Sequence, residues 1–177
     1  MIFDELTTVL APPRIPVETP GVDGWGSVVD AIGFALPVDY MQFVEAYGSG
    51  TINKFIHVFN PFSKNLHINL LQQLTRILAS FRMIKEEFPE EIPFPLLYEP
   101  GGLLPCAMTD NGDVLCWRTV GATGHWSIVV VGRSSACEEY QMPLCRFLGR
   151  VLSGSLNVSA FPADLSPIAS FEQSAAS

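Results

Sequence analysis

The sequence is short of basic side chains and has no long apolar run. Its 177 residues contain 10 lysines and arginines against 18 aspartates and glutamates, a formal net charge of −8. Proteins that follow a phosphate backbone need a basic surface, so this balance argues against nucleic acid as a partner. A membrane-spanning helix needs about 20 largely apolar residues in succession. No such stretch occurs, and we expect no membrane partner.

The first residues do not have the pattern of an export signal. A secretory signal opens with a basic segment. This chain opens with MIFDELTTVLAPPRIP, in which Asp4 and Glu5 precede the first basic residue, Arg14. We therefore expect a cytoplasmic protein.

The cysteines lack the close spacing of a zinc site or a redox pair. No C-x-x-C pair occurs among Cys106, Cys116, Cys137 and Cys145, and structural zinc sites are commonly built from such pairs. If Cys106 and Cys116 lie on adjacent strands of one hairpin, they point to opposite sides of the sheet, because side chains alternate along a strand. We expect free thiols, which are usually buried in a reducing compartment.

Motifs for catalysis are missing as well. The histidines His57, His67 and His125 form no H-E-x-x-H pair, and no G-x-S-x-G nucleophile turn occurs. Gly48-Ser49-Gly50 lacks the spacing and the lysine of a phosphate-binding loop. Asp110-Asn111-Gly112-Asp113 lacks the alternating ligands of a calcium loop. We expect no enzyme, no metal and no cofactor, and keep a small hydrolase only as a remote alternative.

What the sequence does contain is a strong β-hairpin signal. Two apolar runs, Leu103 to Thr109 and Val114 to Thr119, flank Asn111-Gly112. Asn-Gly favours a two-residue type I′ turn, because both central residues take positive φ. A third run, Trp126 to Val131, is apolar at nearly every position, which is typical of a strand covered on both faces. These runs predict a three-strand antiparallel meander at the floor of the core.

Helical periodicity accounts for much of the remaining chain. Apolar residues at i, i+3, i+4 and i+7 predict helices near 25–32, 37–47, 64–88 and 143–152. Residues 51–59 alternate as a single strand would, with a turn after it at Asn60-Pro61. The longest helix is expected to bury one stripe against the sheet. That stripe consists of Leu66, Leu70, Leu74, Leu78, Phe81, Ile84 and Phe88.

Weak patterning marks both ends. Residues 1–22 carry four prolines and are predicted to be an extended lead-in, with at most a short turn of helix near Asp4 to Leu10. A domain over 23–160 follows. Residues 161–177 are predicted to form a C-terminal tail with a loose end.

Acidic residues gather where the long helix stops. Glu86, Glu87, Glu90 and Glu91 surround Pro89, near a helix C-terminus, where the helix dipole disfavours negative charge. Residues placed against local preference can mark function, although a charge run is most often a solvated turn. Candidate contacts for a basic partner are these four glutamates together with Asp110 and Asp113, which a turn at Asn111-Gly112 sets opposite each other.

Three tryptophans are expected to anchor the core: Trp25, Trp117 and Trp126. For Trp126 there is an alternative hypothesis: its side chain is exposed in a loop that binds a partner.

Several of these residues together resemble the SUKH superfamily. This group is named in part for a yeast regulator of cell-wall synthesis and is widespread among bacterial immunity proteins of polymorphic toxin systems. The family pattern acid-x-x-Gly-x-x-Leu-Pro-x-Asp-Tyr stands here as DAIGFALPVDY, with Asp30, Gly33, Leu36, Pro37, Asp39 and Tyr40. Further matches are Phe43, Tyr47, Gly48, Gly50, Ile52, Asn60, Pro61, Asn111, Gly112, Trp117 and the helix from Leu144 to Leu152. Asp30 replaces the family's usual glutamate, and Cys106 stands where an aromatic residue is common.

The resemblance covers residues 24–155 and implies an α+β fold. A twisted, mainly antiparallel sheet would be flanked by about four helices in a single domain. It also implies a non-catalytic immunity protein that masks a basic toxin, often a nuclease. The net charge of −8 suits electrostatic steering towards such a partner. A regulatory or scaffolding domain that binds an endogenous protein is the alternative. The resemblance transfers no contact residues, and the oligomeric state stays open.

Overall fold

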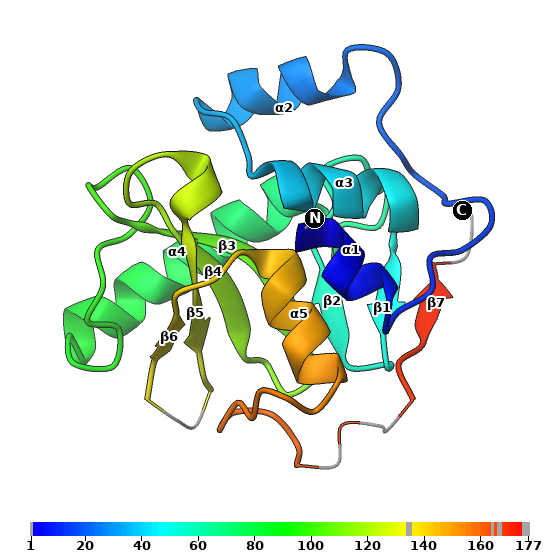
Figure 1. Ribbon diagram of the computed structural model, residues 1–177. Coiled ribbons are helices and arrows are strands. Elements are labelled where there is room, and N and C mark those ends of the chain that lie inside the picture. The colour runs from blue at the N-terminus through cyan, green and yellow to red at the C-terminus, as the bar shows by residue number, and fades with distance from the viewer. Residues whose placement is uncertain (1, 134–135, 164, 166–167, 175–177) are drawn as a thin grey trace.

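The computed structural model describes residues 2–133, 136–163, 165 and 168–174 (Figure 1). These residues form one seven-stranded antiparallel sheet in the order β6-β5-β4-β3-β2-β1-β7, together with five α-helices and one short 3-10 helix. The predicted α+β class is confirmed. The strands are β1 (Gly50–Ile52), β2 (Ile56–Val58), β3 (Leu103–Thr109), β4 (Val114–Arg118), β5 (Ser127–Val131), β6 (Glu138–Tyr140) and β7 (Phe171–Gln173). The helices are α1 (Ile2–Thr7), α2 (Gly24–Ile32), α3 (Val38–Tyr47), α4 (Leu70–Glu87), η1 (Thr123–His125) and α5 (Leu144–Leu152).

Helices cover both faces of the sheet. Helices α1, α3 and α5 pack against one another on one face, whereas α4 crosses behind the sheet in Figure 1. Every residue of β5 is buried, as are six of the seven residues of β3. This covering confirms the interpretation of the apolar run that ends at Val131. Within the described residues, no helix combines the length and apolarity needed to cross a bilayer.

The predicted meander is present as β3, β4 and β5, but its first turn differs from the prediction. The Thr109 N–H donates to the Asp113 carbonyl oxygen at 2.9 Å, so the loop has three residues, Asp110, Asn111 and Gly112. Gly112 alone of these has positive φ, 89°. This is the three-residue hairpin loop in which a residue in the left-handed region follows a tight turn. Asp113 therefore lies opposite Thr109 rather than opposite Asp110.

A register shift in the same hairpin changes the pairing of the cysteines. A turn at Asn111-Gly112 with regular pairing would set Cys106 opposite Trp117, but a bulge between Pro105 and Ala107 sets Leu104 opposite Trp117 and Pro105 opposite Cys116. All four cysteines are free thiols, as predicted, and Cys137 is the one that is only half-buried.

The prediction of a single strand over 51–59 is wrong, because the chain reverses at Asn53-Lys54. Both residues have positive φ, 51° and 53°, and the Phe55 N–H donates to the Ile52 carbonyl oxygen at 2.9 Å. These values define a type I′ turn. Asn tolerates this conformation better than most residues, and its Oδ1 also accepts the Ser170 N–H at 2.7 Å. The two short strands β1 and β2 therefore replace one strand.

Helix α4 begins at Leu70 rather than at residue 64. The Asn69 side chain accepts the Gln72 N–H at 3.1 Å and caps the helix. Before the cap, the Asn60 N–H donates to the Ile68 carbonyl oxygen at 2.8 Å, which holds this segment in a non-helical bridge. The predicted stripe is buried at Leu70, Leu74, Leu78 and Phe81. It is exposed at Leu66, Ile84 and Phe88, where the prediction of burial is wrong.

Both ends of the described chain join the same structure. Helix α1 packs against α5, and Leu6 and Leu10 are fully buried. Strand β7 pairs with β1 at the edge of the sheet. The helix predicted as a short turn near Asp4 to Leu10 is Ile2–Thr7. Residues 171–173 of the predicted C-terminal tail form β7, and its last residues, 175–177, lie outside the described residues.

Candidate partner-binding surface

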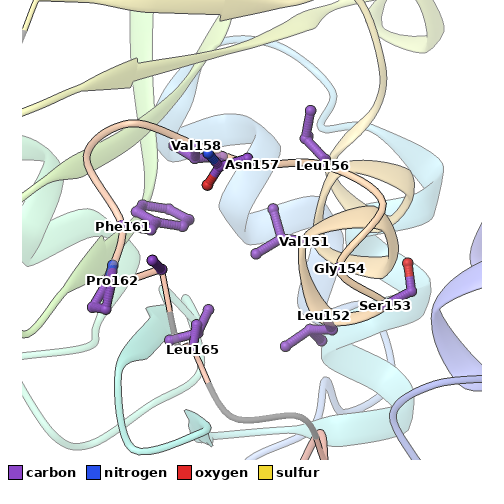
Figure 2. A pocket seen from close by; sticks show the side chains of 11 residues that line it. Val151, Leu152, Ser153, Gly154, Leu156, Asn157, Val158, Phe161, Pro162 and Leu165 are labelled. Atoms are coloured by element: carbon purple, nitrogen blue, oxygen red, sulfur yellow. The ribbon is translucent and has the colours of Figure 1, made fainter.

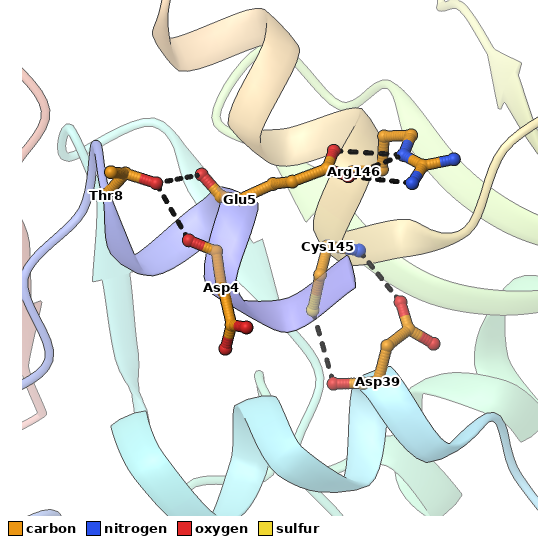
Figure 3. Close-up of polar contacts among 6 residues, drawn as sticks. All are labelled: Asp4, Glu5, Thr8, Asp39, Cys145 and Arg146. Atoms are coloured by element: carbon orange, nitrogen blue, oxygen red, sulfur yellow. Dashed lines mark hydrogen bonds and ion pairs between the residues drawn. The ribbon is translucent and has the colours of Figure 1, made fainter. Parts of the chain in front are cut away.

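The family-motif residues lie mostly inside the fold, and Asp39 shows what they do there. Helix α5 begins after Pro143, whose side chain offers no hydrogen-bond acceptor for the helix. Asp39 from α3 supplies one: its Oδ2 accepts the Cys145 N–H at 2.9 Å, and the Cys145 Sγ donates to the Asp39 carbonyl oxygen at 3.2 Å (Figure 3). The motif therefore holds α5 against α3.

A surface ion pair ties the same helix to α1. Arg146 donates from Nε and Nη2 to the two carboxylate oxygens of Glu5, at 2.9 and 2.7 Å (Figure 3). These hydrogen bonds lower the pKa of Glu5 below its ordinary value. Helix α5 is thus held from two sides by chain segments more than 100 residues away in sequence.

Aromatic motif residues form the centre of the core. The Tyr40 hydroxyl donates to the Phe59 carbonyl oxygen at 2.7 Å, and its ring meets Trp117 edge-on with centroids 4.8 Å apart. Burial raises the pKa of Tyr40 well above its ordinary value. Trp25 is half-buried and donates from Nε1 to Glu45 at 3.0 Å. Leu36 is buried, whereas Asp30 is exposed on α2.

The glycines and Asn60 of the motif serve close backbone approach. A Cβ on Gly48, whose φ is +65°, would lie 2.0 Å from the Val17 carbonyl oxygen. A Cβ on Gly50 would lie 2.4 Å from that of Glu172. The Asn60 Nδ2, just before Pro61, donates to the Glu18 carbonyl oxygen and to Ser49 Oγ, both at 2.9 Å. Gly33 ends α2 with φ 93°. These residues build the scaffold.

The acidic cluster is fully on the surface. Glu86 and Glu87 end α4, Glu90 and Glu91 follow in the next turn, and all four are exposed. Among the described residues none of them has an ion-pair partner. The neighbouring ammonium group donates elsewhere: Lys85 Nζ donates to the carbonyl oxygens of residues 92 and 94, at 2.8 and 2.9 Å.

Exposed apolar side chains accompany this cluster. Met83, Ile84 and Phe88 are 66%, 39% and 52% exposed. Ile84 and Phe88 are four residues apart and share one side of the helix end. Large exposed apolar groups beside charged ones are typical of a surface that meets another protein. We name the three apolar residues and the four glutamates the α4-end surface. Sequence periodicity missed its apolar part, since it assigned Ile84 and Phe88 to the core.

Two of the other predicted contact residues do not present their side chains at the surface. Asp113 is 4% exposed; its Oδ2 accepts the Thr109 hydroxyl at 2.7 Å and its Oδ1 accepts the Arg133 N–H at 3.0 Å. Trp126 is 6% exposed and donates from Nε1 to the Gly121 carbonyl oxygen at 3.2 Å. Both hold loops in place. Asp110 is exposed in the β3–β4 loop.

A hollow of about 600 Å³ lies at the end of α5 (Figure 2). Val151, Phe161 and Leu165 point into it. None of the described residues that line it carries a titratable group. It therefore offers no acid or base from these residues.

A second hollow, of about 300 Å³, brings together His57, Asp110 and Thr109. His57 Nε2 donates to Asp110 Oδ1 at 2.7 Å. A hydrolase would need a free nucleophile beside this pair. The Thr109 hydroxyl instead donates to Asp113 and the residue is 1% exposed. Across the described residues, no three His, Cys, Asp or Glu side chains gather as a metal site would require.

Comparison with known proteins identifies the family. A family model described as SUKH_6, SMI1-KNR4 cell-wall, matches residues 30–144, well over half of the chain. The match begins at the first residue of DAIGFALPVDY and ends where α5 begins. No match was found among curated proteins or among solved structures. Members of this family are generally non-catalytic domains that interact with proteins. The chain therefore belongs to the SUKH superfamily, in its SMI1-KNR4 family.

Proposed function

We propose that this protein is a cytoplasmic immunity protein that binds a cognate toxin with a basic surface, such as a nuclease, and masks it. The observation that carries the proposal is the α4-end surface, where four exposed carboxylates that form no ion pair with a described residue accompany three exposed apolar side chains. Family membership supports a protein-binding role. The charge of the surface supports a basic partner.

The charged and the apolar parts of that surface would affect different steps of binding, association and dissociation. A nuclease needs a basic face, because its substrate is a polyanion. The carboxylates of the α4-end surface would attract that face over about 8–10 Å at physiological ionic strength and would raise the association rate. Met83, Ile84 and Phe88 would then lose contact with water, which slows dissociation. A toxin held in this way cannot bind its substrate on the same face.

The decisive test is co-expression with the product of the neighbouring gene. We expect cells that make the toxin alone to die and cells that also make this protein to survive. Death in both cultures, with both proteins detected, would contradict toxin neutralisation by this pair.

A matched pair of variants tests the surface itself. The double variant Glu87→Gln/Glu90→Gln removes two charges from the α4-end surface, and Asp23→Asn/Asp30→Asn removes two exposed charges near α2. We expect the first to lower the association rate by about tenfold at low salt and the second to change it by less than about twofold. Equal losses would assign the effect to net charge, and no loss in either would remove this surface from the proposal.

The description of the matching family favours a second candidate. That description names the cell wall, and a domain that regulates cell-wall synthesis would bind an endogenous protein. The neighbouring gene distinguishes the two: a large modular toxin gene supports immunity, and its absence supports regulation.

A further inference from the structure

A third hollow, of about 350 Å³, lies at the other end of α4 from the α4-end surface. Its lining is Leu66, His67, Gln72, Gln73, Thr75 and Arg76. No carboxylate is among these residues, although the whole chain carries a net charge of −8. We name it the Arg76 hollow.

The guanidinium in this hollow is held in a fixed position. Arg76 donates from Nε and Nη2 to Gln73 Oε1, at 3.1 and 2.7 Å. Gln73 is 3% exposed, and its own Nε2 donates to the Leu66 carbonyl oxygen at 2.7 Å. The buried Gln73 amide is therefore held by a backbone hydrogen bond through its nitrogen, and its oxygen positions the exposed guanidinium of Arg76. Positioning of this kind lowers the entropy lost when a ligand binds.

This cation has no anion in the described part of the chain. Lys54, Arg118 and Arg146 each form an ion pair with a glutamate, but Arg76 forms none with a described residue. Asp110 lines the adjoining hollow that shares His67, and its Oδ1 accepts a hydrogen bond from His57. The acceptor that holds Arg76, Gln73, is neutral, so no ion pair with a described residue compensates the positive charge of Arg76. Guanidinium Nη1 forms no hydrogen bond with a described residue.

We propose that the Arg76 hollow binds the carboxylate of an acidic side chain on the protein partner. A guanidinium edge pairs with a carboxylate in a planar, often bidentate geometry. His67 and the Gln72 amide line the same hollow and can donate to the second oxygen. The apolar side chain of Leu66, 62% exposed, lies on the rim and can cover the methylene stem. The inference adds a contact of opposite charge to the proposed partner interface, and it depends on the protein-binding role but not on the partner being a toxin.

The test uses the isolated, isotope-labelled protein and a blocked glutamate, N-acetyl-glutamate N-methylamide. Its neutral isostere, N-acetyl-glutamine N-methylamide, is the matched control probe. We expect saturable shifts of the Arg76 Nε–H, the His67 ring and the Gln72 side-chain amide with glutamate and none with glutamine. Equal shifts with both probes would overturn the proposal, as would the absence of shifts with either. Tighter binding of inorganic phosphate would overturn the assignment to a carboxylate.

Two arginines on α4 provide a test variant and its matched control. Arg76→Gln should weaken glutamate binding by about tenfold, since a charge-assisted hydrogen bond is lost. Arg82→Gln removes the same charge from an exposed position on α4 outside the hollow and should change binding by less than about twofold. Equal losses would contradict a built site. Gln73→Leu should weaken binding while Arg76 remains, because the guanidinium is no longer held. This test needs no toxin, so its failure leaves the co-expression result standing, and the reverse also holds.

Discussion

The capping of α5 by Asp39 gives a sharp prediction about stability. In Asp39→Ala the Cys145 N–H loses its acceptor, while Cys145 itself remains fully buried. Losing a hydrogen bond to a charged group and leaving the donor buried costs about 1.5–3 kcal/mol. Loss of a negative charge at a helix N-terminus adds about 0.3–1 kcal/mol. We expect the free energy of unfolding to fall by about 2–4 kcal/mol.

The assay is urea and thermal unfolding of three variants. For a chain of this size, a loss of about 2–4 kcal/mol lowers the Tm by roughly 4–16 °C. Asp39→Asn keeps an acceptor oxygen but loses the charge and should lose about 0.3–1 kcal/mol. Asp30→Ala removes the other acid of the same motif, which is exposed, and should stay within about 0.5 kcal/mol of the parent.

A single result would refute this reasoning. If Asp39→Ala and Asp30→Ala lose the same stability, the buried hydrogen bond to α5 contributes nothing beyond a surface charge. Hydrogen exchange provides an independent check, since the amides in the first turn of α5 should lose protection before those of the central strands.

Two further predictions concern backbone conformation and buried thiols. Gly48→Ala places a Cβ 2.0 Å from a carbonyl oxygen at φ +65° and should cost more than about 4 kcal/mol of stability or prevent folding. The control Gly26→Ala lies in open space on α2 and should be neutral or stabilise the protein by about 0.5–1 kcal/mol. Similar thermal unfolding curves for the two variants would contradict this prediction. Burial raises the pKa of Cys106, Cys116 and Cys145 well above the ordinary value of 9.0, so above pH 9 these thiols ionise in the unfolded chain but stay protonated in the folded one. The free energy of unfolding should therefore fall with a slope approaching about 4 kcal/mol per pH unit, measured by urea unfolding from pH 8 upward, and a flat profile would show that the thiols are not excluded from water.

Sequence patterns predicted the helices and strands of the fold better than the turns that connect them. Apolar runs located β3, β4 and β5, because a strand buried on both faces is apolar almost throughout. The type I′ turn, however, occurs at Asn53-Lys54 and not at Asn111-Gly112. At the second site, the Asp113 carboxylate accepts hydrogen bonds from the Thr109 hydroxyl and the Arg133 N–H, and Asp113 closes a three-residue loop just before β4 begins. The bond to Arg133 spans 20 residues, so a local turn signal does not include it.

Asp39 illustrates the same limit at a single residue. Its place in the first turn of α3 fits the dipole of that helix, and this local role is all that sequence spacing can predict. Its hydrogen bond to Cys145 spans 106 residues. Only the packing of α5 against α3 reveals that the motif aspartate serves the other helix.

The candidate surface was predicted in its charges but not in its apolar part. Glutamates near a helix end are readily expected to be exposed, because burying an unpaired carboxylate is costly. Periodicity assigned Ile84 and Phe88 to the buried stripe for a different reason. A helical period shows that residues share one side of a helix, but it does not show how far along the helix that side is covered. In this protein the cover ends between Phe81, which is 4% exposed, and Ile84, which is 39% exposed.

The two proposed contacts lie on one line along α4. Arg76, Met83 and Glu87 are spaced at i, i+7 and i+11, which at 100° per residue places all three within about 20° of one direction. All three are exposed. The line from Arg76 to Glu87 is about 17 Å long at 1.5 Å per residue, whereas an interface of standard size, about 800 Å² on each partner, is roughly 30 Å across. One partner surface can therefore meet the cation and the carboxylates together. Because the two charges are opposite, a partner with the complementary pair can dock in only one direction along the helix, and reversing it would set like charges against each other at both ends.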